Sequence, residues 1–67
     1  MKKEELFRKL KIAIENEYDA YKMYKEIADT SADAELKVIF NRIAEEEYNH
    51  WQTIQKRYSI LEQLADD

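Results

Sequence analysis

Three ionisable residues in this 67-residue chain have the types and spacing of metal ligands. Glu17 lies in the first half of the chain, whereas Glu47 and His50 lie three residues apart in the second half. Residues three apart on a helix are neighbours on one face, so Glu47 and His50 can point at the same ion. Carboxylate oxygens with one imidazole per metal suit iron or manganese better than zinc, which prefers tetrahedral sites with more nitrogen or sulfur. A redox metal is therefore expected if the fold brings Glu17 to the other two residues.

The segments that carry these residues are expected to be helices. The chain contains no Gly, Pro or Cys, so tight turns between strands have few residues to form them. Ala, Glu, Lys and Leu are abundant, and these residues favour helix. The absence of Cys also excludes rubredoxin-type, iron–sulfur and thiolate-zinc sites. We therefore predict an all-α protein.

One short segment, residues 29–33, interrupts the helical pattern. Thr30 or Ser31 can cap a second helix, and Asp33 then lies in its first turn, where the helix dipole favours an anion. We predict a single domain over residues 1–67. It consists of a helix at about 3–29, a turn at about 30–31 and a helix at about 32–65.

Apolar residues recur in steps of four and three along both segments, which is the heptad seam of helices packed nearly parallel or antiparallel. The first seam consists of Leu6, Leu10, Ala13, Glu17, Ala20, Tyr24 and Ile27. The second consists of Leu36, Phe40, Ile43, Glu47, His50, Ile54, Arg57, Leu61 and Leu64. Flanking rows widen both stripes: Phe7, Ile14, Tyr21 and Ala28 on one helix, and Ala44, Trp51, Tyr58 and Ala65 on the other. A short connection makes the helices antiparallel neighbours, and two helices alone cannot cover stripes this wide. We predict an antiparallel two-helix hairpin that dimerises into a four-helix bundle.

Glu17 and Glu47 lie equally far from the turn, on either side of it. In an antiparallel hairpin their carboxylates therefore face each other at one level, with His50 about 4.5 Å further along the second helix. That level is also the middle of both helices. If two hairpins pair about a two-fold axis, the centre of the dimer holds two copies of each residue.

Such a cluster requires cations. An unpaired buried carboxylate costs several kcal/mol, and neighbouring carboxylates repel one another. Two divalent cations neutralise four glutamates, and bridging carboxylates hold two metals about 3.5–4 Å apart, a spacing used in two-metal chemistry. We expect two metal ions per dimer.

The motifs on the two helices resemble those of the ferritin-like superfamily, and of rubrerythrins in particular. Family members typically carry a Glu, a small residue three positions later and an aromatic residue seven positions later, here Glu17, Ala20 and Tyr24. On another helix they carry Glu-x-x-His, here Glu47 to His50. A usual rubrerythrin or ferritin domain has four helices in one chain. This chain therefore looks like the half-size members, such as encapsulated ferritins, in which two hairpins share one di-iron site.

The resemblance implies non-haem iron redox chemistry. Two irons per dimer would bind Glu17, Glu47 and His50 of both chains, which are then also the catalytic residues, with manganese as an alternative metal. O₂ or peroxide would oxidise Fe(II), as in a ferroxidase or a rubrerythrin-like peroxide or O₂ reductase. Tyr21 and Tyr24, four and seven residues after Glu17, are expected to stand beside the ligands, where they hydrogen-bond a carboxylate or limit access.

Composition limits the partners and the compartment. The net charge is −4, and the sequence shows no basic stripe of the kind that binds nucleic acid. The longest apolar runs, residues 12–14 and 38–40, are far shorter than the 18 or so residues that a membrane span needs. We expect a cytoplasmic homodimer or higher oligomer, with neither nucleic acid nor membrane as a partner. The resemblance to encapsulated ferritins adds an encapsulin shell as partner and compartment, although residues 64–67 match no targeting tail.

Two other functions stay open at the level of sequence. The chain could be a metal-binding module that holds iron, manganese or zinc without turnover. It could also be a metal-free helical hairpin that serves as a dimeric adaptor, in which Glu17, Glu47 and His50 form a salt-bridge network in the core.

Overall fold

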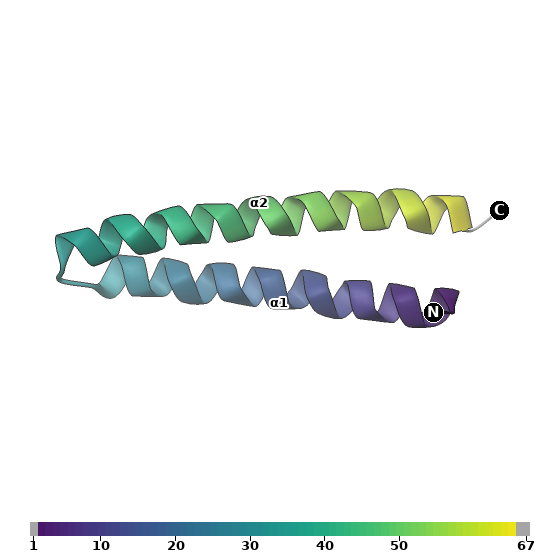
Figure 1. The fold of residues 1–67 in the computed structure, drawn as a ribbon, viewed down its shortest axis with the longest axis horizontal. Helices are drawn as coiled ribbons and strands as arrows, with labels where there is room; N and C mark the ends of the chain where they lie inside the picture. The colour runs from purple at the N-terminus through teal and green to yellow at the C-terminus, as the bar shows by residue number, and fades with distance from the viewer. Residues whose placement is uncertain (1, 66–67) are drawn as a thin grey trace.

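The computed structural model describes residues 2–65, and of Ala65 only the backbone, so the predicted domain of residues 1–67 extends beyond the described part at both ends. Helix α1 spans Lys3–Thr30 and helix α2 spans Ala34–Ala65. They lie side by side in a rod 52 Å long, and the start of α1 and the end of α2 are at the same end (Figure 1). The prediction of an all-α antiparallel hairpin is confirmed. Within the described residues, neither helix has a stretch long and apolar enough to cross a membrane.

Asp33, rather than Thr30 or Ser31, caps the second helix. The Leu36 N–H donates to the Asp33 Oδ1 at 2.9 Å, and the Asp33 N–H donates to the Ser31 Oγ at 3.1 Å. Thr30 belongs to α1, where its hydroxyl donates to a carbonyl one turn earlier at 2.8 Å. The predicted cap is therefore wrong. Helix α2 begins at Ala34, two residues later than predicted, because the Asp33 carboxylate is the group that reaches a free N–H of the first turn.

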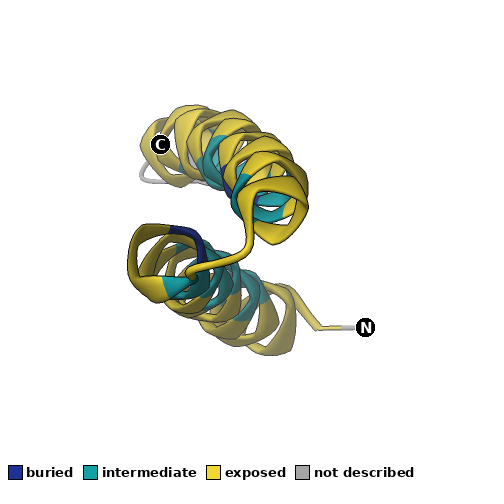
Figure 2. Cartoon of the chain, turned by 90° about the vertical axis from the view of Figure 1, so that its left-hand side faces the viewer, coloured by how far each residue is buried: buried dark blue, intermediate teal, exposed yellow. Residues whose placement is uncertain are grey.

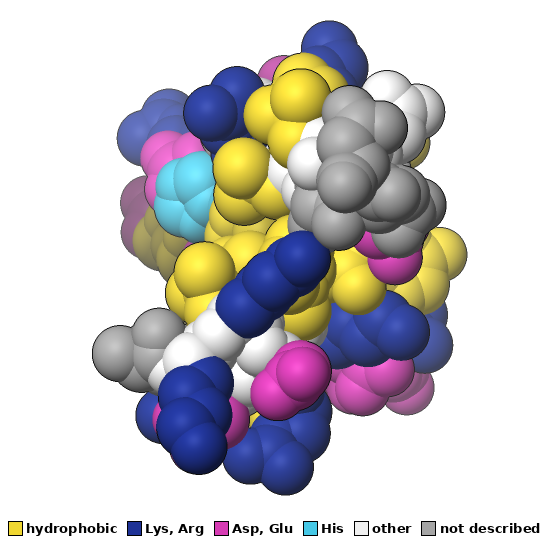
Figure 3. Space-filling model, turned by 90° about the vertical axis from the view of Figure 1, so that its right-hand side faces the viewer, with side chains coloured by type: hydrophobic (Ala, Val, Ile, Leu, Met, Phe, Trp, Pro, Cys, Tyr) yellow, Lys and Arg dark blue, Asp and Glu magenta, His cyan; other side chains and the backbone are white. Residues whose placement is uncertain are grey.

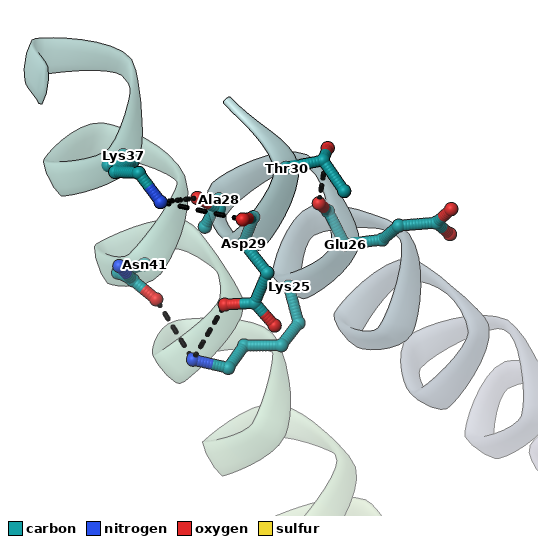
Figure 4. A network of polar contacts seen from close by, with 7 residues as sticks. All are labelled: Lys25, Glu26, Ala28, Asp29, Thr30, Lys37 and Asn41. Carbon is teal, nitrogen blue, oxygen red and sulfur yellow. Dashed lines mark hydrogen bonds and ion pairs between the residues drawn. The ribbon is translucent and has the colours of Figure 1, made fainter. Parts of the chain in front are cut away.

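Polar contacts beside the turn join the end of α1 to α2 (Figure 4). The Lys37 ammonium donates to the carbonyl oxygens of Ala28 at 3.0 Å and Asp29 at 3.4 Å. These carbonyls lie near the C-terminus of α1, where the helix dipole is negative and intrahelical donors are missing. Lys25 donates to the Asn41 Oδ1 at 3.1 Å, also across the hairpin. The charge of Lys37 therefore stabilises the C-terminus of α1 and links it to α2.

The hairpin by itself buries few side chains. Among the described residues, Ala28 and Ala44 alone are buried, at 1% and 2% exposure. Both belong to the flanking rows, whose other described members are half-buried. Partly buried residues line the inner sides of the two helices, and the outer sides are exposed (Figure 2). The helices thus meet along the flanking rows, where two small side chains allow a close approach.

The seam residues lie at one edge of this contact, on a surface that we call the seam face. It comprises the two heptad seams together with Met23, Ile39 and Ile60, each of which lies three residues after one seam residue and four residues before another. Large apolar side chains are exposed on this face: Leu6, Met23, Leu36, Ile39, Ile60 and Leu64. Seen from the open end of the hairpin, hydrophobic side chains gather in the middle of the view, with one Lys or Arg side chain across them and further charged side chains around them (Figure 3). The seam face is therefore an apolar surface that a single hairpin leaves uncovered.

Candidate metal centre

The structure brings Glu17 of α1 together with Glu47 and His50 of α2 on the seam face. The His50 Nδ1 lies 3.7 Å from the Glu17 Oε2 and 3.8 Å from the Glu47 Oε1. One potential ligand atom of each residue lies within 4.8 Å of those of the other two. The side chains meet at one level, as their equal distances from the turn predict. Their role as metal ligands stays a prediction.

The three side chains differ in depth. The carboxylates of Glu17 and Glu47 are half-buried, with 29% and 23% of the side chain exposed, whereas the His50 side chain is 59% exposed. The carboxylates thus lie deeper than the imidazole, near the contact between the helices. Because the cluster opens onto the seam face, one chain covers only one side of an ion held there.

One carboxylate oxygen of the cluster has no partner. The Glu17 Oε2 is buried, and no described residue donates a hydrogen bond to it. The His50 nitrogen at 3.7 Å is too far away for such a bond. A buried acceptor without a partner is rare and costly. A cation would satisfy this oxygen, and two carboxylates with an imidazole fit iron or manganese as the donor set.

The neighbouring carboxyl group of Glu17 raises the pKa of Glu47. The largest cause is the hydrogen bond that a protonated Glu47 can share with the Glu17 carboxyl, followed by partial burial and by the negative charge of Glu17. The charge of Glu46 raises it further, and His50 acts in the opposite direction. Two carboxylates this close cannot both ionise easily. In the metal-free site, the charge of one carboxylate therefore disfavours ionisation of the other.

Tyr21 and Tyr24 make ring contacts in the structure. The Tyr24 ring packs against Phe40 with centroids 5.8 Å apart, and the Tyr21 ring packs against Tyr48 at 5.2 Å. Within residues 2–65, no hydrogen bond joins either hydroxyl to the two carboxylates. The expected contact of these tyrosines with the ligands stays a prediction.

The interpretation of the sequence missed an aromatic cluster formed by Tyr18, Tyr21, Tyr48 and Trp51. Three of its members directly follow Glu17, Glu47 and His50 in the chain. One step along a helix turns the side chain by about 100°, so these rings lie away from the seam face. The repeated order of candidate ligand and then aromatic residue is the signal that could have revealed the cluster.

A family model described as Rubrerythrin matches residues 9–66 of the chain. The chain belongs to the rubrerythrin family. Neither a curated protein nor a solved structure matches it. The matched part of this rubrerythrin contains Glu17, Glu47 and His50, and rubrerythrins typically bind iron. The resemblance seen in the two motifs is thus confirmed, and the chain has a candidate iron site. That two such hairpins share one site, as in half-size members, stays a prediction.

Proposed function

We propose that two copies of this chain pair through their seam faces and hold two irons between them, and that O₂ or peroxide oxidises the irons from Fe(II). The observation that carries the proposal is the cluster of Glu17, Glu47 and His50, with an unpartnered buried oxygen, in the middle of an apolar surface. Membership of the rubrerythrin family supports iron as the metal.

A second copy of the chain is the partner that best fits the seam face. Exposed apolar side chains flank the cluster on both sides: Met23, Leu36 and Ile39 toward the turn, and Leu6, Ile60 and Leu64 toward the open end. A two-fold axis through the cluster would lay the turn half of one copy on the open half of the other. Both halves would then cover apolar surface, and each removed Å² contributes roughly 25 cal/mol.

Ligand number and charge also favour the pair of chains. One copy offers two carboxylates and one imidazole from three residues, which leaves an iron or manganese ion with open positions. Two copies offer four carboxylates and two imidazoles. Their four negative charges balance two divalent cations, and a neutral cluster can be buried where four bare carboxylates cannot.

Iron, when bound, supplies the one-electron redox chemistry, and the chain supplies position, charge and a dry surrounding. Glu17 and Glu47 would neutralise the cations, and His50 would offer a neutral ring nitrogen. A bound cation would favour the ionised form of Glu47, because it offsets the repulsion between the two carboxylates that contributes to the raised pKa of Glu47. Apolar side chains of both seam faces would keep bulk water from the centre.

Titration of the metal-free protein with Fe(II) in air tests this proposal. We expect saturation at one iron per chain, oxidation faster than in buffer, and a ferric-oxo absorbance band. Glu17→Gln and Glu47→Gln should lose iron and oxidation together. Glu45→Gln, which removes the charge of an exposed glutamate on α2, is the matched control and should keep both.

The other two functions predict different results in the same experiment. A metal-binding module would bind iron but would not oxidise Fe(II) faster than buffer does. A metal-free adaptor would have the same iron content in the wild type and in Glu47→Gln. Measuring iron content and sedimentation on the same samples separates these cases, and either result contradicts the proposed activity.

A further inference from the structure

We propose that the aromatic cluster of Tyr18, Tyr21, Tyr48 and Trp51 carries electrons from a small hydroquinone-type donor to the metal centre. This inference rests on the proposed function. It adds the chemical class of the electron donor and the place where electrons enter.

Each of the four rings contacts two of the others. Trp51 lies 5.1 Å from Tyr18 and 5.5 Å from Tyr48, measured between ring centroids. Tyr21 lies 5.2 Å from Tyr48 and 5.9 Å from Tyr18. Phenol and indole are the side chains that give up single electrons most readily to strong oxidants, and electrons tunnel rapidly between rings this close. An electron that enters at any ring can therefore reach all four.

The cluster lies next to the candidate ligands. Tyr18, Tyr48 and Trp51 each adjoin one of them through the backbone. Adjoining residues have Cα atoms about 3.8 Å apart, so these three residues start from backbone positions next to those of the candidate ligands. The cluster thus connects the centre on the seam face to the solvent on another face of the hairpin.

A surface cleft marks the place of entry. It has a volume of about 300 Å³ and is lined by Ile14, Glu15, Tyr18, Asp19 and Trp51. The exposed fraction of Tyr18, 37%, leaves its ring accessible to a flat molecule. The carboxylates of Glu15 and Asp19 can accept hydrogen bonds from donor hydroxyl groups. Even with the Lys22 ammonium beside Asp19, they leave a negative charge that disfavours an anionic reductant. A neutral hydroquinone fits these features.

Lys22 determines how Tyr18 can be oxidised. Its ammonium lies 5.1 Å from the centre of the Tyr18 ring and 3.6 Å from the Asp19 carboxylate. A positive charge over the ring disfavours a ring cation, which favours loss of the phenol proton together with the electron.

The overall reaction balances with peroxide as oxidant and hydroquinone as reductant. Peroxide gains two electrons and two protons and becomes two waters when its O–O bond breaks. Hydroquinone loses two electrons and two hydroxyl protons and becomes a quinone. In between, each electron that reduces the peroxide would leave a ring of the cluster together with its O–H or N–H proton, and the hydroquinone would return both to the ring.

The metal-free protein allows a direct test of the path, because Trp51 is the one tryptophan of the chain. Photochemical one-electron oxidation of Trp51 should give an indole radical that decays as a tyrosyl radical appears. Replacing both tyrosines that touch the indole, Tyr18→Phe with Tyr48→Phe, should make the indole radical persist. Tyr58→Phe, whose ring pairs with Phe7 outside the cluster, should behave as the wild type. A persistent indole radical in the wild type would overturn the proposal.

The iron-loaded protein tests the function of the path. Trp51→Phe keeps an aromatic ring in place but cannot supply electrons. We expect hydroquinone-dependent consumption of peroxide to fall by an order of magnitude, while iron content and Fe(II) oxidation match those of Tyr58→Phe. Equal peroxide consumption in both variants would sink the proposal. If the chain binds no iron, the proposed function is wrong. The photochemical experiment still shows whether electrons pass between Trp51 and the tyrosines.

Discussion

Glu47 ionises less readily than an ordinary glutamate because the Glu17 carboxyl lies beside it. Its pKa in the folded chain is raised above the ordinary value of 4.5. The folded metal-free protein therefore gains stability from protonated Glu47 at low pH and loses it as the pH rises through the raised pKa. Glu47→Gln, which resembles the protonated acid, should raise the melting temperature of the metal-free protein by a few degrees near neutral pH.

The same variant provides its own pH control. The difference in melting temperature between Glu47→Gln and the wild type should disappear as the pH falls below the ordinary carboxyl range, because both side chains are then neutral. Circular dichroism melts at fixed chain concentration measure this difference. Glu45→Gln removes an equal charge from an exposed position of the same helix. A difference of the same size for Glu45→Gln would show that net charge, and not the carboxylate pair, sets the stability.

Each helix end next to the turn depends on one charged side chain. Asp33 accepts the Leu36 N–H at the start of α2, so Asp33→Ala should lower the free energy of unfolding by about 1 kcal/mol. Asp33→Asn keeps an acceptor oxygen and should recover most of this loss. Thr30→Ala, at the residue first expected to cap, should change stability little. Urea unfolding of the three variants distinguishes the two candidate caps. A larger loss of stability for Thr30→Ala than for Asp33→Ala would show that Thr30 caps the helix.

Lys37 acts on the other helix end. Its ammonium donates to the free carbonyls of Ala28 and Asp29, and Lys37→Met keeps the apolar stem while it removes the charge. We expect a loss of about 1 kcal/mol in the free energy of unfolding. Lys56→Met is the matched control, because Lys56 is exposed on the same helix and forms no hydrogen bond or ion pair within residues 2–65. An equal loss in both variants would contradict the capping role.

The molecule as a whole exposes apolar surface on the face that holds the candidate site. Ile39 lies on the seam face and is 49% exposed, whereas its neighbour Val38 lies on another face and is 60% exposed. In a lone hairpin, lysine at either position would cost little. In the proposed dimer, Ile39→Lys would bury a charge and should weaken association more than tenfold, a cost above about 1.4 kcal/mol. Val38→Lys should sediment as the wild type does. Equal dimer fractions for the two lysine variants would show that the interface is not on the seam face.

Metal binding and pairing should also strengthen each other. A metal that binds the folded dimer stabilises it by about 2.7 kcal/mol at a hundredfold excess over its dissociation constant. Adding Mn(II) to the metal-free protein should therefore raise both the melting temperature and the dimer fraction. The double variant of Glu17→Gln and Glu47→Gln should pair without responding to Mn(II). A wild type that binds Mn(II) at an unchanged dimer fraction would mean that one chain completes the site.

Much of the fold and of the candidate site follows from the sequence alone. A chain without Gly or Pro, with apolar residues in steps of four and three, has to form two helices around one interruption. Because the helical rise is constant, equal distances from the turn place Glu17 and Glu47 at one level, with His50 less than one turn away. These relations need no knowledge of packing, so the cluster could be predicted from spacing.

Packing decided what spacing could not. Seam and flanking rows are both apolar, so the heptad pattern leaves open how far each helix is rotated about its axis. Tertiary structure selects the rotation in which the small side chains of Ala28 and Ala44 allow the closest approach, since close packing gains the most contact. That rotation leaves Glu17, Glu47 and His50 at the edge of an open apolar face, and it turns the rings beside them toward one another. The cap was also decided in three dimensions, because the hydrogen bond from Leu36 to Asp33 depends on the path of the chain through the turn and not on residue type alone.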